Sequence, residues 1–240
     1  MSIPTEQPEA PWIVTEEADG APVEAVWVNE IGGTTWRIGR GEAADYLKVQ
    51  PEHREFDLRG ELARLDWVAG LLPTPRVVSY GGDGELEWLR TRSLGGENAV
   101  SPTNRARPEV VVPALGRALR RLHDSLPVRD CPFTWDVDDR LASLSGTERR
   151  PVPAVARGDL VVCHGDACSP NFLLGPDAEC VGYVDLGRLG LADRHADLAP
   201  AVLSLGWNYG PGWMLPFLKA YGHPVDQERL AFYTWLWQAE

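Results

Sequence analysis

The sequence predicts an α+β protein in which a small antiparallel β-sheet precedes a larger, mainly helical part. Residues 23–28, 34–38 and 45–49 are rich in β-branched and aromatic residues and are separated by turns that contain Gly. After residue 93, most of the apolar residues recur at helical spacing. The 240 residues are enough to bury a large core and to form two lobes. We expect an N-terminal lobe over residues 1–92 and a C-terminal lobe over residues 93–240.

The first part of the chain also contains a helix and two further strands. Leucines at helical spacing predict a helix over residues 52–70, which closes at Gly70. Residues 77–80 and 86–91 return to a strand pattern. Residues 93–108 are rich in Gly, Asn and Pro, and we interpret them as an irregular crossing between the lobes.

The second part is predicted to be helical on both sides of a short stranded region. The helices are expected over residues 110–126, 140–144, 192–205, 213–221 and 227–238. Three short apolar segments, 160–163, 172–174 and 181–184, are typical of strands. Internal repeats and low-complexity tracts do not stand out in the sequence.

The charge and composition exclude several classes of partner. A net charge of −12 argues against a nucleic-acid surface, which usually needs a basic patch, and would attract a polycationic ligand. The sequence has no run of about 18 apolar residues and no signal-peptide pattern at its N-terminus. The four cysteines lack C-x-x-C spacing and fit reduced thiols. We therefore expect a cytoplasmic protein that contacts no nucleic acid and no membrane.

Three polar residues follow the short strands of the second part in a suggestive order. Asp166 and Asn171 follow the first strand, and Asp185 follows the third, directly before Leu186-Gly187. Phosphoryl transfer needs an acceptor for a hydroxyl proton and oxygen ligands for magnesium. A base, a metal-binding Asn and a metal-binding Asp occur in this order in catalytic loops of the protein-kinase type. Asp166 and Asn171 also fit an ordinary turn, but the joint spacing favours a phosphoryl-transfer site.

This region resembles the aminoglycoside phosphotransferases, in particular the 3′-phosphotransferase branch. The matching motifs occur in that family's order: Tyr46-Leu47-Lys48, residues 72–77, Leu122-His123, residues 130–133, Arg140-Leu141, residues 164–171, residues 185–190, Ala192-Asp193-Arg194 and Asp197-Leu198-Ala199. The resemblance runs from about residue 25 to the C-terminus. It implies a two-lobe fold of the protein-kinase type and transfer of the γ-phosphate of ATP, with Mg²⁺, to a hydroxyl of an aminoglycoside antibiotic, an activity that confers antibiotic resistance.

The resemblance also assigns roles around the catalytic loop. Asp166 would accept or orient the proton of the acceptor hydroxyl, and Asn171 and Asp185 would bind Mg²⁺. His164 would orient the loop, and Arg188 would brace Asp185 or a neighbouring carboxylate. Loss of turnover in Asp166→Ala, with the fold intact, is the expected consequence.

Nucleotide-binding residues are expected in the first lobe. Lys48 lies in an apolar strand, where a charge needs a partner, and by resemblance it would hold the α- and β-phosphates. Glu61 is the candidate partner on the following helix, and Glu55 is the alternative. Tyr46 matches an aromatic residue that stacks on adenine in some family members, although a simple strand aromatic fits as well.

A glycine-containing loop precedes the second predicted strand. Gly32, Gly33 and Thr34 would lie over the phosphates with free backbone N–H groups, because glycine permits close approach. The fuller glycine pattern of protein kinases is missing, so a plain hairpin turn fits this segment equally well.

The expected substrate region departs from the family pattern. The family binds its cationic substrate with an acidic insertion and with carboxylates at the C-terminus. Here the connection 143–159 is short and contains Glu148-Arg149-Arg150, and Trp237 and Gln238 stand where the family has an acidic pair. The remaining candidates for substrate binding are Asp136, Asp139, Trp237 and Glu240.

Three functions therefore stay open at this stage. The first is an aminoglycoside 3′-hydroxyl kinase with a rebuilt pocket. The second is a kinase of another hydroxylated metabolite such as an amino sugar, whose ring would suit stacking on tryptophan. The third is a nucleotide-binding relative without activity, which the presence of Lys48, Asp166, Asn171 and Asp185 disfavours.

Overall fold

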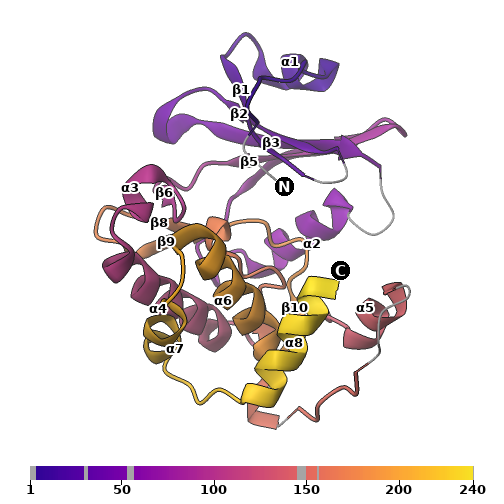
Figure 1. Ribbon diagram of the computed structural model, residues 1–240. Coiled ribbons are helices and arrows are strands. Elements are labelled where there is room, and N and C mark those ends of the chain that lie inside the picture. The colour runs from indigo at the N-terminus through magenta and orange to yellow at the C-terminus, as the bar shows by residue number, and fades with distance from the viewer. Residues whose placement is uncertain (1–3, 30–31, 53–56, 145–149, 156, 240) are drawn as a thin grey trace. The chain divides into compact units, whose positions relative to one another are not determined.

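The computed structural model describes residues 4–29, 32–52, 57–144, 150–155 and 157–239. The chain separates into two compact units (Figure 1). The first contains Met1–Ala69 and Pro73–Gly95, and the second contains Gly70–Leu72 and Gly96–Glu240.

The first unit is built on a five-stranded antiparallel sheet with the order β1-β2-β3-β5-β4. Its strands are β1 (Val23–Val28), β2 (Thr34–Ile38), β3 (Asp45–Pro51), β4 (Val77–Gly82) and β5 (Leu86–Arg92). The predicted small antiparallel sheet is thus confirmed. Lys48 lies on the central strand β3, opposite Thr35 of β2 and Leu89 of β5.

Two helices and a short 3₁₀ turn, Gly41–Ala43, complete the first unit. Helix α1 (Trp12–Ala18) was not expected from the sequence, and it packs Ile13 and Val14 into the core of the sheet beside Trp36. Helix α2 (Leu58–Val68) is shorter than the predicted 52–70, because Asp57 caps its start through the N–H of Gly60 and the chain is extended again at Ala69.

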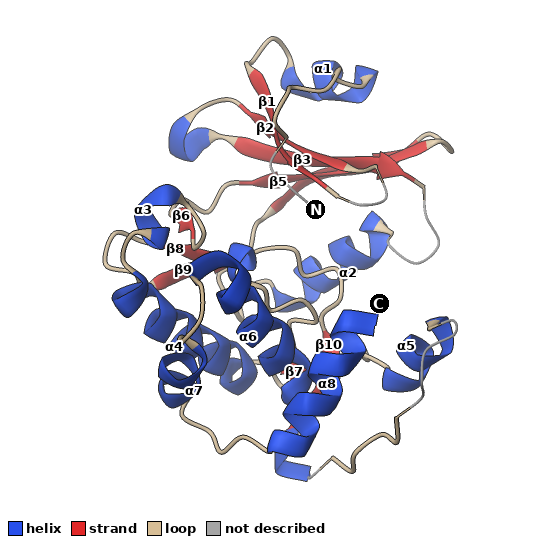
Figure 2. Cartoon of the chain, in the orientation of Figure 1, coloured by secondary structure: helices blue, strands red, loops and turns tan. Residues whose placement is uncertain are grey.

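The second unit is mainly helical (Figure 2). Its helices are α3 (Pro102–Arg105), α4 (Pro108–Ser125), α5 (Val137–Ser143), α6 (His195–Tyr209), α7 (Met214–Tyr221) and α8 (Gln227–Ala239). Helix α4 buries one apolar face and packs closely on α7: a Cβ on Gly116 would lie 2.5 Å from the carbonyl oxygen of Phe217. Helices α6 and α8 pack together, and α6 also contacts α7.

Short strands carry the polar loops of the second unit. They are β6 (Glu97–Asn98), β7 (Leu160–Cys163), β8 (Phe172–Leu174), β9 (Cys180–Tyr183) and β10 (Gly190–Asp193), with 3₁₀ turns at Arg157–Asp159 and Ser169–Asn171. β7 pairs with β10, and β6, β8 and β9 form a second small sheet.

Two expectations for the second unit are wrong in detail. The helix expected at 192–205 begins at His195, because Gly190–Asp193 pairs with β7 as a strand. The segment 93–108, expected to be irregular, contains β6, α3 and the first residue of α4. Among the described residues, no helix is long and apolar enough to cross a bilayer.

Candidate active site

The loop between β7 and β8 holds Asp166 and Asn171 in a fixed relation. The Asn171 side-chain Nδ2 donates to the backbone carbonyl of Asp166 at 2.8 Å, and this bond leaves Oδ1 of Asn171 as the oxygen available to a cation. The backbone carbonyl of Asn171 accepts from the N–H of Val184 at 3.1 Å, directly before Asp185. The loop is thereby tied to the end of β9.

The Asp166 carboxylate is half-buried, and its Oδ1 is buried without a hydrogen-bond partner among the described residues. A buried acceptor without a partner is costly, which indicates that a hydroxyl or a cation completes this site. Burial chiefly raises the pKa of the nearby Cys168 thiol, and the negative charges of Asp166 and Asp185 raise it further.

His164 connects the catalytic loop to the segment of Asp185. The ring of His164 is fully buried. Its Nδ1 accepts a hydrogen bond from the backbone N–H of Asp166 at 3.3 Å, and its Nε2 lies 3.0 Å from the carbonyl oxygen of Val184. Because Nδ1 accepts, the proton of the neutral ring belongs on Nε2, which then donates to Val184. The ring thus bridges the loop and the segment before Asp185, and the orienting role of His164 stays a prediction.

Asp197, near the start of α6, anchors the same loop. Its Oδ2 accepts the backbone N–H of His164 at 2.6 Å, and its Oδ1 accepts that of Gly165 at 2.9 Å. His123 Nε2 lies 3.0 Å from Oδ2. Burial alone would raise the pKa of this carboxyl, but the contact with His123 and the backbone N–H of Gly165 hold the pKa below its usual value.

Gly165 and Asp185 both have a backbone with a positive φ. Gly165 has φ +85°, and a Cβ there would lie 2.0 Å from the backbone carbonyl oxygen of Arg188. Asp185 has φ +61°, a left-handed conformation that is uncommon outside glycine. In a residue other than glycine, such as Asp185, this conformation persists only where the surroundings enforce it, and such residues cluster at functional sites. The bracing role of the Arg188 side chain stays a prediction.

In the first unit, Lys48 and Glu61 form a close ion pair. Lys48 Nζ donates to Oε1 and Oε2 of Glu61 at 2.8 and 2.7 Å, and the Glu61 side chain is 7% exposed. The alternative partner, Glu55, lies outside the described residues. Tyr46 is half-buried on the same strand, two residues before Lys48, so the two side chains share one face of the sheet.

The glycine loop is closed by its own hydrogen bonds. The N–H of Gly33 donates to Oδ1 of Asn29 at 2.6 Å, and the N–H of Asn29 donates to the carbonyl of Gly33 at 2.9 Å. The expectation of a free N–H at Gly33 is therefore wrong, because the Asn29 side chain already occupies it. Gly32 has φ +83° with open space where a Cβ would lie, and Thr34 begins β2. The hydrogen bonds of Gly33 are those expected for a hairpin turn, the alternative interpretation of this segment.

The candidate substrate residues are more scattered. Asp136 caps α5, where its Oδ1 accepts the N–H of Asp138 at 2.8 Å and that of Asp139 at 3.4 Å. Asp139 is exposed in the first turn of this helix, and Trp237 is half-buried on α8. Glu240 lies outside the described residues. Capping occupies one oxygen of Asp136, so this residue has a structural function as well.

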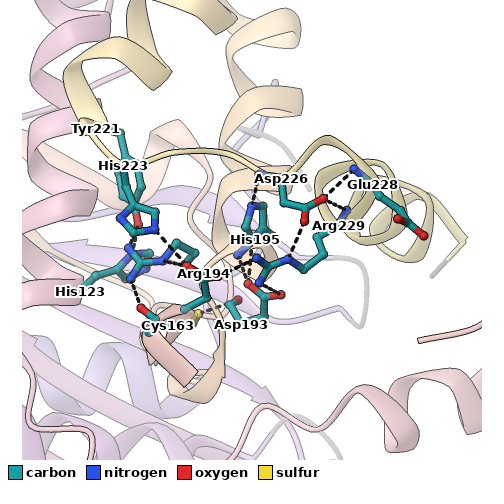
Figure 3. A network of polar contacts seen from close by, with 12 residues as sticks. His123, Cys163, Asp193, Arg194, His195, Tyr221, His223, Asp226, Glu228 and Arg229 are labelled. Atoms are coloured by element: carbon teal, nitrogen blue, oxygen red, sulfur yellow. Dashed lines mark hydrogen bonds and ion pairs between the residues drawn. The ribbon is translucent and has the colours of Figure 1, made fainter. Parts of the chain in front are cut away.

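A buried polar network joins α4, β10 and the starts of α6 and α8 (Figure 3). Arg229 of α8 donates to Asp193 Oδ2 at 3.1 Å and to Asp159 Oδ2 at 2.6 Å, and Arg194 donates to Asp159 Oδ1 at 3.1 Å. Burial would raise the pKa of Asp159, but its hydrogen bond with Arg229 lowers it overall. No local pattern in the sequence marks Arg229, because its contacts join three separate segments.

One group in this network has the residue types of a metal site. The ligand atoms of His123, Cys163 and Asp197 lie within 4.8 Å of one another, and no other such group of three occurs in the described part of the chain. Each of the three side chains already has a hydrogen-bond partner. His123 Nδ1 bonds with the Tyr221 hydroxyl at 2.8 Å, and the Cys163 thiol donates to the carbonyl of Asp193. Asp197 accepts from the backbone of the loop. Burial also raises the pKa of Cys163, which disfavours the thiolate that a metal needs. The group is a structural network.

The fold and this loop define a class of phosphoryl-transferring proteins. The model of the phosphotransferase enzyme family matches residues 30–156 and 137–233, and the chain belongs to this family. The chain is 38% identical to an aminoglycoside 3′-phosphotransferase of Streptomyces fradiae over 232 residues, which cover 80% of this chain and 84% of that protein. It is 34% identical to streptomycin 3″-kinase of Streptomyces griseus, covering 94% of this chain and 96% of that one.

Solved structures agree with this assignment. The structure of an aminoglycoside-3′-phosphotransferase of type VIII matches with a TM-score of 0.78 and 30% identity, over 92% of this chain and 94% of that one. That of the aminoglycoside phosphotransferase APH(3″)-Id from Streptomyces rimosus, in complex with ADP and streptomycin, matches with a TM-score of 0.74 and 27% identity, over 95% of this chain and 97% of that one. These matches confirm the expected family and its kinase-like fold.

Proposed function

We propose that this protein transfers the γ-phosphate of ATP to a hydroxyl of an aminoglycoside, with 3′-type regiochemistry. The observation that carries this proposal is the Asp166 carboxylate, whose buried Oδ1 lacks a partner among the described residues, on a loop anchored by Asp197. Its support is the 38% identity to an aminoglycoside 3′-phosphotransferase over 80% of the chain. We further propose that the protein acts in the cytoplasm and confers resistance to its substrate.

The donor set fits Mg²⁺ with a nucleotide. Asn171 presents an amide oxygen, because its Nδ2 is bonded to the Asp166 carbonyl, and Asp185 supplies a carboxylate. Mg²⁺ prefers oxygen ligands of this kind together with substrate phosphates. When bound, the ion neutralises charge on the phosphates. Lys48, oriented by Glu61, holds the α- and β-phosphates.

Catalysis in this proposal depends on positioning more than on basicity. The acceptor hydroxyl donates a hydrogen bond to the Asp166 carboxylate, which aligns the oxygen for attack on the γ-phosphorus. The new O–P bond forms as the bond to the β,γ-bridging oxygen breaks, ADP leaves with the electron pair, and the hydroxyl proton passes to Asp166. Because the transition state of phosphoryl transfer is loose, alignment dominates the rate enhancement.

A second acceptor class is favoured by one specific observation. The match to streptomycin 3″-kinase spans 94% of this chain, against 80% for the 3′-phosphotransferase of S. fradiae. Streptomycin is therefore the second candidate acceptor, and an amino sugar is the third.

The test is Mg²⁺-dependent ADP release by the purified protein. ATP and GTP would each be combined with kanamycin, neomycin, streptomycin and singly charged amino sugars, with Asp166→Ala as the control. Turnover of kanamycin or neomycin that vanishes in the variant supports the 3′-type proposal, and product NMR then locates the phosphate. Turnover of streptomycin alone moves the protein to the second class. Wild-type rates in Asp166→Ala would refute the mechanism.

A further inference from the structure

Trp135 lies in the segment that leads into α5 and is 7% exposed. Its backbone N–H donates to the carbonyl of Leu191 at 3.0 Å, and the N–H of Leu191 donates to the carbonyl of Phe133 at 2.9 Å. Thr134 forms a parallel bridge with Leu191 of β10. These bonds fix the backbone of Trp135 against the strand that pairs with β7, directly before the catalytic loop.

The side chain of Trp135 reaches the loop itself. Its indole Nε1 donates to the backbone carbonyl of Gly165 at 3.4 Å, and both groups are buried. The N–H of the same peptide unit, contributed by Asp166, donates to His164 Nδ1. Side chains therefore bind both polar groups of the planar peptide that precedes Asp166, one on each side. A planar unit held at both ends cannot rotate without breaking a bond.

The indole ring is itself held in place by two neighbours. The guanidinium carbon of Arg140, on α5, lies 3.9 Å from the ring centroid, within the range of a cation–π contact. The ring of Tyr233, on α8, lies 6.0 Å away at an interplanar angle of 57°. The orientation of the N–H toward Gly165 is thus set by α5, α8 and β10 together.

We propose that Trp135 is a positioning residue for the reaction: its indole N–H fixes the Gly165–Asp166 peptide and so sets the direction of the Asp166 carboxylate. This inference rests on the proposed phosphotransferase function. Trp135 touches no reacting atom, and its effect passes through the peptide bond that carries the base. Its loss lowers the turnover number and leaves ATP binding by Lys48 unchanged, because Lys48 belongs to the other unit.

The substitution Trp135→Phe separates positioning from packing, since phenylalanine keeps an aromatic ring against Arg140 and Tyr233 but lacks the N–H. We expect kcat to fall by about three- to tenfold, the magnitude of one lost hydrogen bond, with KM for ATP within twofold of the wild type. Trp36→Phe is the matched control: Trp36 is a buried tryptophan of β2 whose indole N–H has no hydrogen-bond partner among the described residues. A general loss of aromatic packing would lower kcat in both variants.

Hydrogen–deuterium exchange supplies a readout that needs no turnover. In Trp135→Phe, peptides covering residues 164–171 should exchange at least threefold faster than in the wild type, while peptides from α4 (Pro108–Ser125) stay unchanged. In Trp36→Phe, neither region should change. Unchanged exchange at 164–171, or equal acceleration in both regions, overturns the positioning role and leaves Trp135 as a core residue.

The two readouts keep this inference apart from the proposed function. If the wild type phosphorylates an acceptor but Trp135→Phe has the same kcat, the inference fails and the function stands. If the wild type phosphorylates nothing in the panel, the function fails, and exchange at 164–171 alone decides on Trp135.

Discussion

Asp197 Oδ2 accepts the backbone N–H of His164 at 2.6 Å, so a buried carboxylate of α6 carries the loop that presents Asp166. Its other oxygen accepts the next N–H, from Gly165. A carboxylate is acceptor-only, which suits two adjacent donors, whereas an amide offers one oxygen and two N–H groups. The conformation of this loop therefore depends on a residue that contacts only its backbone.

Asp197→Asn should therefore impair both activity and stability. The side-chain NH₂ of the new asparagine must face one of the two N–H groups of the loop, so one hydrogen bond is lost. The negative charge of Asp197 beside His123 is also lost. We expect kcat to fall by about 100-fold and the free energy of unfolding to fall by about 3 kcal/mol, as for other buried pairs that lose one partner. Steady-state kinetics and urea unfolding measure the two effects. Asp177→Asn, at an exposed turn, is the control and should match the wild type.

Because of Asp197, the free energy of unfolding should depend on pH in the acid range. The pKa of Asp197 is lowered in the folded protein, so its contribution is present above the unfolded pKa of about 3.9 and is lost as the pH falls through the lower folded value. The difference in unfolding free energy between the wild type and Asp197→Asn should be constant from about pH 5 to 7 and shrink below about pH 4. Urea titrations at pH 7, 5, 4 and 3 measure it. A difference that grows toward acid would contradict the assigned direction.

Lys48 should act on nucleotide binding and, through its pair with Glu61, on stability. Lys48→Met keeps the apolar stem and removes the charge, which leaves Glu61 without this partner and the phosphates without their cation. We expect kcat/KM for ATP to fall by at least about 100-fold, and the free energy of unfolding to fall by about 3 kcal/mol because the Glu61 side chain, only 7% exposed, loses this partner. Lys219→Met makes the same chemical change at an exposed position of α7 and should be silent. Equal losses in both variants would exclude a specific role for Lys48.

Asp185 is predicted to bind the metal from a left-handed backbone. Asp185→Asn keeps a residue type that tolerates φ +61° and removes one negative charge. Turnover should fall by about 1,000-fold, and the Mg²⁺ concentration needed for half-maximal activity should rise. Asp19→Asn is the matched control, since Asp19 also has a positive φ, at the C-terminal end of α1. Removal of Mg²⁺ with EDTA should abolish wild-type turnover in the same assay.

Local patterns in the sequence explain why much of the fold could be predicted. The five strands of the sheet and the face of α4 carry their own hydrophobic periodicity, and Asp166, Asn171 and Asp185 occur in a recognisable order. Other features have no local signal. Helix α1 begins after Pro11 without a side-chain cap, and β10 is a strand only because β7 pairs with it.

The contacts that hold the loop could not be predicted from local sequence patterns either. Trp135 and Gly165 are 30 residues apart, as are Cys163 and Asp193, and such contacts depend on how distant segments pack. The tight fit of Gly165 against the carbonyl of Arg188 is of the same kind. A histidine-glycine-aspartate motif indicates that the glycine is needed, but only the structure says which atom excludes a side chain.

Gly165→Ala tests that fit directly. A Cβ at this position would lie 2.0 Å from the Arg188 carbonyl oxygen, and the backbone has a φ of +85° that alanine disfavours. The backbone must shift, so we expect a loss of at least about 3 kcal/mol in the free energy of unfolding and no measurable turnover. Gly84→Ala separates the two causes, because Gly84 has φ +94° with open space around the added methyl. That control should lose only about 1–2 kcal/mol and keep its kcat, since it shares the backbone strain but has no clash; equal effects in the two variants would show that the contact with Arg188 is unimportant.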